Sequence, residues 1–433
     1  MVSSIDGLVS GLSTSDLISQ LMQVEAAGQT RLKTRVTAQQ KVNASYQSIN
    51  TKIAALKTAS TTVMDATAPI WANAKATASS DAVSVTASAG ASTGQLTFDV
   101  KRLAQANTQT STVASTGSIQ NGAGLSVTIG TTTTPITVTT DTAQGVVDAI
   151  NGAGIGVKAA LVSTEQGTTV LQLNATKTGT ANAFTVNGLT APLTQMVTAQ
   201  DAQIGVGTVG AGGYTVTSAS NTFTNLMPNV SITAKRVETG VTVTVSADAD
   251  AIANKVQAMV EAANGLLTEL GTQSAITPAS STSTSPTGAP LAGNSMVRQL
   301  QQSLLSAVSI GESAYGSFKQ LGIQTDRNGK LVFDRSAFLT AYQADPAKVQ
   351  AAVTNGIGKS FKTLSTEANN NVTAVIQSGA SNVRYLTDQI ANWDVRLTAK
   401  QEALQKQFTN LEVALGKLKD QSSWLAGQIA QLG

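Results

Sequence analysis

The sequence predicts an α+β multidomain protein, with coiled-coil termini and a helical bundle from both chain ends and antiparallel β-rich domains inserted between them. Near both ends, apolar residues recur every three or four positions, which is the spacing of one helix face. Between about residues 75 and 246 the period changes to two, the spacing of half-buried strands. The chain has 433 residues. That length suits roughly two to four domains with a sizeable core.

The first helical region covers about residues 14–66 and is expected to form one helix or two. Ser13 followed by Asp16 resembles a capping box, which predicts where the helix begins. Gly28 is expected to interrupt the apolar pattern, because glycine weakens helices. The short stripe before it consists of Leu17, Leu21 and Val24.

Beyond Gly28 the apolar residues alternate spacings of four and three, which is typical of a coiled-coil seam. A helix packed in an ordinary bundle explains this stretch about equally well. The seam, with Ser60 as a weak member, consists of Val42, Tyr46, Ile49, Ile53, Leu56 and Val63.

The middle of the chain predicts antiparallel hairpins. One joins residues 83–86 to residues 96–100 through a glycine-containing turn, and another joins residues 230–234 to residues 241–245. In both hairpins apolar and polar residues alternate, so one face of each sheet is expected to be buried.

A segment of about residues 108–198 has its own pattern and is expected to be a small β-rich domain inserted into another. A short helix at about residues 142–150 is expected to be capped by Asp141 and ended by Asn151 and Gly152. The strands expected around this helix are residues 125–129, 136–140, 157–162 and 170–173.

Helices are expected again after Asp248. The carboxylates of Asp248 and Asp250 would lie at the start of the first of these helices and interact favourably with its dipole. The first helix is expected to end at Gly271, and residues 272–293 after it have the composition of a flexible loop. The stripes are Ile252, Val256, Met259, Ala263, Leu266 and Leu270 before the loop, and Val297, Leu300, Leu304 and Val308 after it.

Turn and cap residues mark the elements that follow. Asn328 and Gly329 predict the turn of a hairpin. Asp334 and Asp345 are each expected to cap a helix, the second of which has proline in its first turn. A further helix is expected at about residues 360–376.

The last helix is expected to cover about residues 381–432, roughly 75–80 Å at ~1.5 Å per residue. Its two halves keep different heptad phases, and the switch near Lys400 and Gln401 amounts to a stutter. The first phase contains Val383, Leu386, Ile390, Trp393 and Leu397, and the second contains Leu404, Phe408, Leu411, Leu415, Leu418, Leu425, Ile429 and Leu432.

Both chain ends therefore carry apolar stripes that need a partner. The final stripe would contribute ~10–20 kcal/mol when covered, at ~1.5–3 kcal/mol per side chain, and would promote aggregation when exposed. We expect the stripes to bind each other, copies of this chain, or another protein. The predicted protein-interaction residues are Leu17, Leu21, Leu404, Phe408, Leu411, Leu415, Leu418, Leu425 and Ile429.

Composition narrows the classes of function. The chain contains no His and no Cys, which removes disulfides, thiolate and histidine metal sites, and nucleophiles paired with His. It has no basic patch interleaved with aromatics and no long apolar run, so neither nucleic acid nor a membrane span is expected. Asp326, Asn328 and Asp334 do not have the spacing of a calcium-binding EF-hand loop. We expect no catalytic residue, no metal and no cofactor.

The predicted elements divide the chain into segments of helical and β-rich character. Residues 1–41 and 381–433 are the helical ends, 42–74 and 248–380 form a bundle, 75–107 and 199–247 form one β-domain, and 108–198 is inserted into that domain.

Several stretches, in family order, resemble the flagellar hook-associated protein 2 family, the filament cap proteins of bacterial flagella. Gly28 departs from that family, which often has proline there, and the inserted segment matches it least in detail. The matching stretches are IDGLVSGLSTSDLISQLMQVE, VSVTASAGASTGQLTFDVKRLAQAN, TSASNTFTNLMPNVSITAKRVETGVTVTVSAD, LGIQTDRNGKLVFD and QFTNLEVALGKLKDQSSWLAGQI.

The resemblance implies that the terminal helices form legs, the bundle a body and the β-domains a plate. It implies a small closed, pentamer-like ring of copies at the distal tip of the filament, outside the cell, with flagellin inserting below. Before secretion, a cytoplasmic export chaperone and the flagellar type III export apparatus are implied partners. The N-terminus lacks the basic start and apolar core of a secretory signal peptide, so export without a cleaved signal is expected.

Two other classes of protein stay open. Another axial flagellar protein, such as flagellin or a hook-associated junction protein, would share helical ends and low cysteine, but flagellin's N-terminal Asn-rich and Leu-Ser-Ser-Gly blocks are absent. A secreted carboxylate hydrolase or an adhesin with a coiled stalk is the second class. The sequence has no persuasive pair of acids, which argues against the hydrolase.

Overall fold

The chain folds into two compact units, one made of residues 1–64 with 253–433 and the other of residues 65–252. Helices dominate the first unit and strands the second, which confirms the predicted α+β class. The computed structural model describes residues 11, 13–65, 70–165, 168–208, 212–279, 286–309, 311 and 316–430.

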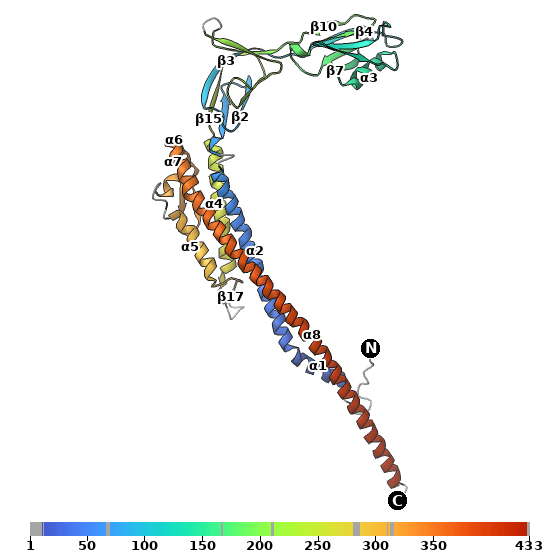
Figure 1. Cartoon of the computed structure of the whole chain (residues 1–433), viewed down its shortest axis with the longest axis vertical. Helices are drawn as coiled ribbons and strands as arrows, with labels where there is room; N and C mark the ends of the chain where they lie inside the picture. The colour runs from blue at the N-terminus through green and yellow to red at the C-terminus, as the bar shows by residue number, and fades with distance from the viewer. Residues whose placement is uncertain are drawn as a thin grey trace. The chain divides into compact units, whose positions relative to one another are not determined.

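Two long helices organise the first unit: α2 (Ala27–Met64) and α8 (Lys359–Ala430), with the shorter α1 (Thr14–Glu25) before them. Figure 1 shows the blue α2 and the orange α8 lying side by side. Side-chain hydrogen bonds show that the two helices are antiparallel. Gln29 near the start of α2 donates to the Ile390 carbonyl, and Gln39 further along accepts from Asn382.

The seam predicted for α2 is confirmed. Its central residues are almost fully shielded from solvent, since Ile49 is 1% exposed and Ile53 is 0% exposed. Ser60, the weak member, is buried as well. The other buried seam residues are Tyr46, Leu56 and Val63, and Val42 is half-buried.

The helix expected at residues 360–376 and the last helix are one continuous helix of 72 residues in α8, and the break expected between them is wrong. Gly379 lies at the expected break. A Cβ there would lie 2.0 Å from Asn43 Oδ1 of α2. Glycine at this position therefore allows two helices to approach closely, which matters more here than its weak helix propensity.

The remaining elements of the first unit pack beside the long helices, and the predicted stripes of α4 and α5 are buried. The structure differs from the sequence expectation at the loop: α4 continues past Gly271, and two short strands pair within the loop, whose residues 280–285 lie outside the described residues. The elements are α4 (Ala249–Ser274), β16 (Ile276–Thr277), β17 (Thr287–Gly288), α5 (Ser295–Ser309), the 3₁₀-helix η3 (Phe318–Leu321), β18 (Ile323–Thr325), β19 (Leu331–Phe333), α6 (Arg335–Ala344), α7 (Pro346–Ala351) and the π-helix η4 (Ala352–Gly358).

Aspartates cap three helices, and two of these caps, in α6 and α7, were predicted. Asp334 accepts from two backbone amides at the start of α6, Asp345 accepts from one in α7, and Asp248 accepts from one in α4. Two other predicted caps are wrong. Ser13 makes no side-chain hydrogen bond to α1, and Thr142 instead of Asp141 caps the helix of the second unit.

Glu269 links α4 to α2 and makes stability depend on pH. Its carboxylate accepts from Ser48 Oγ at 2.7 Å and from Gln273 Nε2 at 2.8 Å. The hydrogen bond from Ser48, and after it the one from Gln273, lowers the pKa of the Glu269 carboxyl. A carboxyl with a lowered folded pKa stabilises the fold above its unfolded pKa, and this contribution is lost as pH falls through the folded pKa.

We therefore expect Glu269→Gln to reduce the fall in unfolding temperature between about pH 7 and about pH 3. Circular dichroism at both pH values measures this difference. Glu261→Gln is the control, because the Glu261 carboxylate accepts from Gln257 of the same helix. An equal fall in wild type and Glu269→Gln would contradict the assignment.

The second unit begins with two antiparallel sheets that share one core. The larger has the strand order β1-β15-β3-β11-β12, and the smaller has the order β13-β14-β2. Phe98, Phe223 and Ile232 lie in the core that the two sheets bury. The strands are β1 (Ala74–Ala78), β2 (Val83–Ala87), β3 (Gly94–Arg102), β11 (Ala202–Val206), β12 (Tyr214–Ser218), β13 (Thr222–Phe223), β14 (Val230–Ala234) and β15 (Glu238–Ala247), and the 3₁₀-helix η1 (Ile70–Ala72) precedes them.

Between β3 and β11 the chain builds two further sheets, ordered β10-β4-β8-β7 and β6-β5-β9, around a separate core. Helix α3 contributes Val146, Val147 and Ile150 to this core. Gln105 and Gln200 pair where the chain enters and leaves this part. The elements are β4 (Thr108–Val113), β5 (Leu125–Ile129), β6 (Thr132–Ile136), α3 (Ala143–Ala153), β7 (Val157–Ser163), β8 (Thr169–Ala175), η2 (Thr180–Asn182), β9 (Phe184–Asn187) and β10 (Thr194–Val197).

One strand of this part differs from the sequence expectation. The strand expected at residues 136–140 lies at Thr132–Ile136 instead, because the chain reverses directly after β5. Ile129 pairs with Thr132 across a two-residue turn that contains Gly130 with φ +59°. Tight hairpin turns of this kind need a left-handed residue, which glycine supplies without a steric cost.

Candidate interaction surface

The C-terminal apolar stripe is only partly covered by the rest of the chain. Leu404, Phe408 and Leu415 are half-buried, whereas the residues facing outward form what we call the exposed stripe. Its members and exposed fractions are Leu411 (46%), Leu418 (60%), Leu425 (55%) and Ile429 (64%). Leu432 lies outside the described residues. The predicted stripe therefore forms one helix face, and much of that face is free to bind a partner.

Helix α1 packs on α8 through a different face from the predicted one. Leu17 and Leu21 are 46% and 43% exposed. Ile18 is buried instead, and with Met22 it lines a hollow of about 440 Å³ bordered by Gln401 of α8. Sequence reasoning missed this inner face, although Ile18 and Met22 also have helical spacing. The predicted residues Leu17 and Leu21 form a second outward apolar patch.

The junction of α1 and α2 is held by an aromatic contact with α8. Gly28 leaves room for the half-buried indole of Trp393, since a Cβ at this position would lie 2.8 Å from Trp393 Cζ2. Arg396 lies over the indole at 5.0 Å from the ring centroid. Gln29 donates to the carboxylate of Asp394. Gly28 therefore lets the start of α2 pack closely on Trp393 of α8, whereas the sequence predicted only an interrupted helix.

We expect Gly28→Val to displace the Trp393 indole and to destabilise the α2–α8 contact by ~1–3 kcal/mol, as overpacking does. Trp393 fluorescence should shift to longer wavelength in a Trp71→Phe/Trp424→Phe background, where it is the remaining tryptophan. Gly427→Val is the matched control, because a Cβ there meets no atom within 4 Å. Unchanged Trp393 emission in Gly28→Val would contradict the packing role.

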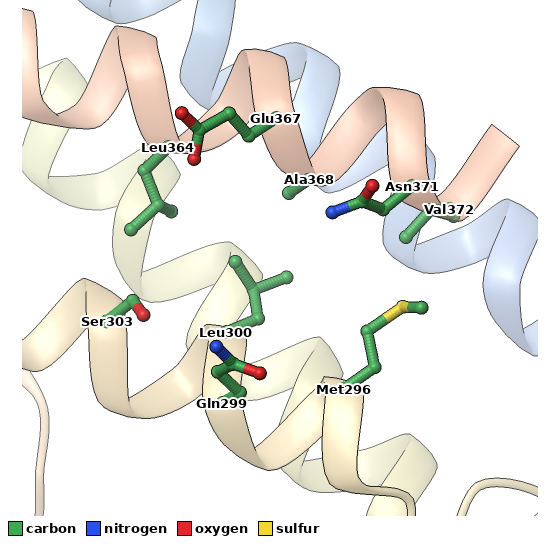
Figure 2. A pocket seen from close by; sticks show the side chains of 9 residues that line it. All are labelled: Met296, Gln299, Leu300, Ser303, Leu364, Glu367, Ala368, Asn371 and Val372. Carbon is green, nitrogen blue, oxygen red and sulfur yellow. The ribbon is translucent and has the colours of Figure 1, made fainter. Parts of the chain in front are cut away.

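A smaller hollow of about 160 Å³ lies between α5 and α8. Figure 2 shows Met296 and Leu300 of α5 opposite Glu367 and Asn371 of α8. This volume is below the ~300–1,000 Å³ typical of ligand pockets. Glu367 is the one carboxylate in the lining, so the hollow offers no acid–base pair.

The described residues hold neither a candidate metal site nor a candidate membrane span. No group of three or more His, Cys, Asp or Glu residues suited to a metal is found in the described part of the chain. None of the helices within the described ranges is both long and apolar enough to cross a membrane. The outward apolar residues of α1 and α8 are therefore the principal candidates for function.

Comparison with known families places this surface in context. Residues 10–107 match the model for the flagellar hook-associated protein 2 N-terminus, and residues 199–420 match that for its C-terminus. The chain belongs to the flagellar hook-associated protein 2 family. The gap between the two family matches, residues 108–198, coincides with the segment expected as an insertion.

Relatives in this family match along most of the chain. Flagellar hook-associated protein 2 of Escherichia coli strain K12 is 27% identical over 462 residues, covering 98% of this chain and 97% of that protein. The protein of the same name from Salmonella typhimurium strain LT2 is 27% identical over 320 residues, or 67% of each chain. The crystal structure of the D1-D2-D3 domains of the flagellar cap protein FliD from Escherichia coli has a TM-score of 0.57 and 23% identity. It covers 78% of this chain and 99% of its own, so the fold is shared.

Proposed function

We propose that this protein caps the distal end of the bacterial flagellar filament and promotes the folding and insertion of exported flagellin. The observation that carries the proposal is family membership along nearly the whole chain, from residue 10 to residue 420 with one internal gap. A role as another axial protein, such as flagellin or a junction protein, is not favoured, because the matching relatives are hook-associated protein 2.

The exposed stripe supports a role in binding rather than catalysis. Three of its members, Leu418, Leu425 and Ile429, are more than half exposed on one helix face. Exposure of these apolar side chains to water is unfavourable, and a neighbouring helix that covers them would be stabilised by their burial. We propose that the exposed stripe, with Leu17 and Leu21, contacts filament or cap subunits, and that Leu404, Phe408 and Leu415 join the same contact.

We further propose that copies of the chain close into a small ring outside the cell. Head-to-tail contacts that close give a finite assembly, which a cap needs, whereas contacts that do not close give fibres. Native mass measurement should therefore show one discrete oligomer. A ladder of growing fibres would argue for a filament subunit instead. We also propose flagellin, an export chaperone and the flagellar export apparatus as partners.

Deleting the gene tests the proposed function. Cells without it are expected to release flagellin into the medium as monomer and to carry no long filaments, and the wild-type gene should restore the filaments. Immunoblots of the medium and electron microscopy of the cells measure the two outcomes. Filaments of normal length in the deletion strain would refute the proposal.

A further inference from the structure

Helix α2 carries an unusual distribution of charge. Its 38 residues contain six Lys or Arg and no Asp or Glu. Four of the six lie in its first half and are exposed to solvent, namely Arg31, Lys33, Arg35 and Lys41. Folding does not require exposed cations, and repulsion between them opposes the helix, since like charges one turn apart are destabilising.

The facing part of α8 does not neutralise these charges. We call residues 27–45 of α2 and residues 376–400 of α8 the basic stalk. The α8 part adds Arg384, Arg396 and Lys400 against Asp388 and Asp394, so the basic stalk has seven cations and two carboxylates, an excess of five positive charges. Lys400 pairs with Glu25 of α1 at 3.7 Å.

Five other cations of the basic stalk have no ion partner among the described residues. Within the described ranges, no carboxylate lies within 4.0 Å of Arg31, Lys33, Arg35, Lys41 or Arg384. Asp394 is occupied by Gln29. An excess of unpaired, exposed charge raises the rate and specificity of association with a surface of opposite sign.

The uncharged side chains that lie among the cations favour a protein partner. Arg31 and Arg35 are one turn apart on one side, whereas Lys33 lies about 200° from Arg31 at ~100° per residue. Large uncharged side chains lie among the cations of α8, since Tyr385 is 61% exposed and Val395 is 71% exposed. Arg and Tyr beside apolar residues are typical of protein interfaces.

We propose that the basic stalk is a docking surface for an acidic face of the filament subunit, distinct from the apolar contact of the exposed stripe. This inference rests on the proposed function, because capping brings filament subunits alongside the helical unit. The charges of the stalk attract and orient the subunit, and Tyr385 and Val395 supply the apolar contact that holds it.

Co-sedimentation of the full-length protein with filaments from the same bacterium tests this inference. Arg31→Glu/Lys33→Glu/Arg35→Glu is expected to weaken binding at least about tenfold, because it replaces attraction by repulsion. Raising salt from about 50 to about 200 mM should weaken wild-type binding severalfold and affect the variant little, since salt screens exposed charges. The matched control, Lys255→Glu/Lys319→Glu/Lys348→Glu, makes the same change in net charge at exposed positions elsewhere and should bind as wild type does.

Each alternative result overturns the inference. If the stalk variant binds as well as wild type, or if the control loses as much affinity, the basic stalk is not the docking surface, and the proposed function is unaffected. If the stalk variant loses binding to duplex DNA or to anionic vesicles but keeps binding to filaments, the partner is a polyanion. If it changes the native oligomer and leaves filament binding intact, the partner is a second copy. If wild type itself fails to bind filaments and is absent from their tips, the proposed function fails too.

Discussion

Replacing Leu418 and Leu425 by Asp is expected to abolish filament growth while the protein stays folded. Both side chains are more than half exposed, so neither substitution removes a large contact from the isolated chain. In the assembly, each Asp would place an unpaired charge in an apolar contact. Burying an unpaired charge costs several kcal/mol of binding free energy. Cells with this variant should release flagellin as monomer, measured by immunoblotting of the medium.

A control variant separates the apolar stripe from added charge. Thr409→Asp/Ser423→Asp adds two carboxylates at exposed positions of the same helix, off the stripe. This control should support normal filaments. Circular dichroism of the purified Leu418→Asp/Leu425→Asp variant should match wild type. Normal motility of cells carrying it would show that the exposed stripe is not needed.

Truncation of Leu56 to Ala is expected to lower the free energy of unfolding of the helical unit by ~2–5 kcal/mol, the usual cost of a cavity in a core. Leu56 is 0% exposed and lies in the α2 seam. Because the strands form a separate compact unit, their unfolding should be unchanged. The same truncation at Leu418, which is 60% exposed, should change stability by no more than ~0.5 kcal/mol.

Thermal melts followed at a helix wavelength and a strand wavelength measure this pair of variants. We expect Leu56→Ala to move the helix transition to lower temperature and to leave the strand transition in place. Equal shifts of both transitions would show that the two units unfold together. An equal loss of stability in Leu418→Ala would show that the exposed stripe is part of the folded core.

The helical seams could be predicted from the sequence because burial there follows a strict period. The residues from Tyr46 to Val63 lie on one face of α2, and a face of that width must be covered in water. The buried stripe of α4 could be predicted for the same reason. The cap residue Asp334 could be predicted for a different reason. A carboxylate just before a helix accepts hydrogen bonds from the unpaired backbone amides of the first turn.

Periodicity could not identify the inner face of α1, because two apolar faces compete there. Leu17 and Leu21 have helical spacing, and so do Ile18 and Met22, which face α8. Which of the two faces is buried depends on the residues of α8 that lie opposite α1, and only the tertiary structure shows these. Gly379 illustrates the same limit, since its role is set by Asn43 of a helix more than 300 residues away in the sequence.

The boundary between covered and exposed residues of the C-terminal stripe was also invisible in the sequence. Leu404 and Leu418 occupy equivalent positions in the heptad pattern, yet the first is half-buried and the second is 60% exposed. A periodic apolar pattern indicates that one face of a helix is covered by another surface. It does not record which partner covers each turn, so the division between intramolecular and intermolecular contact requires the fold.

Immunogold electron microscopy of intact flagella tests the central claim most directly. Antibodies raised against the purified protein, applied to cells with full-length filaments, should place gold at the distal tips and nowhere along the shaft. The deletion strain supplies the background. Gold distributed along the filament, or confined to its base, would contradict the assignment of this protein as the filament cap.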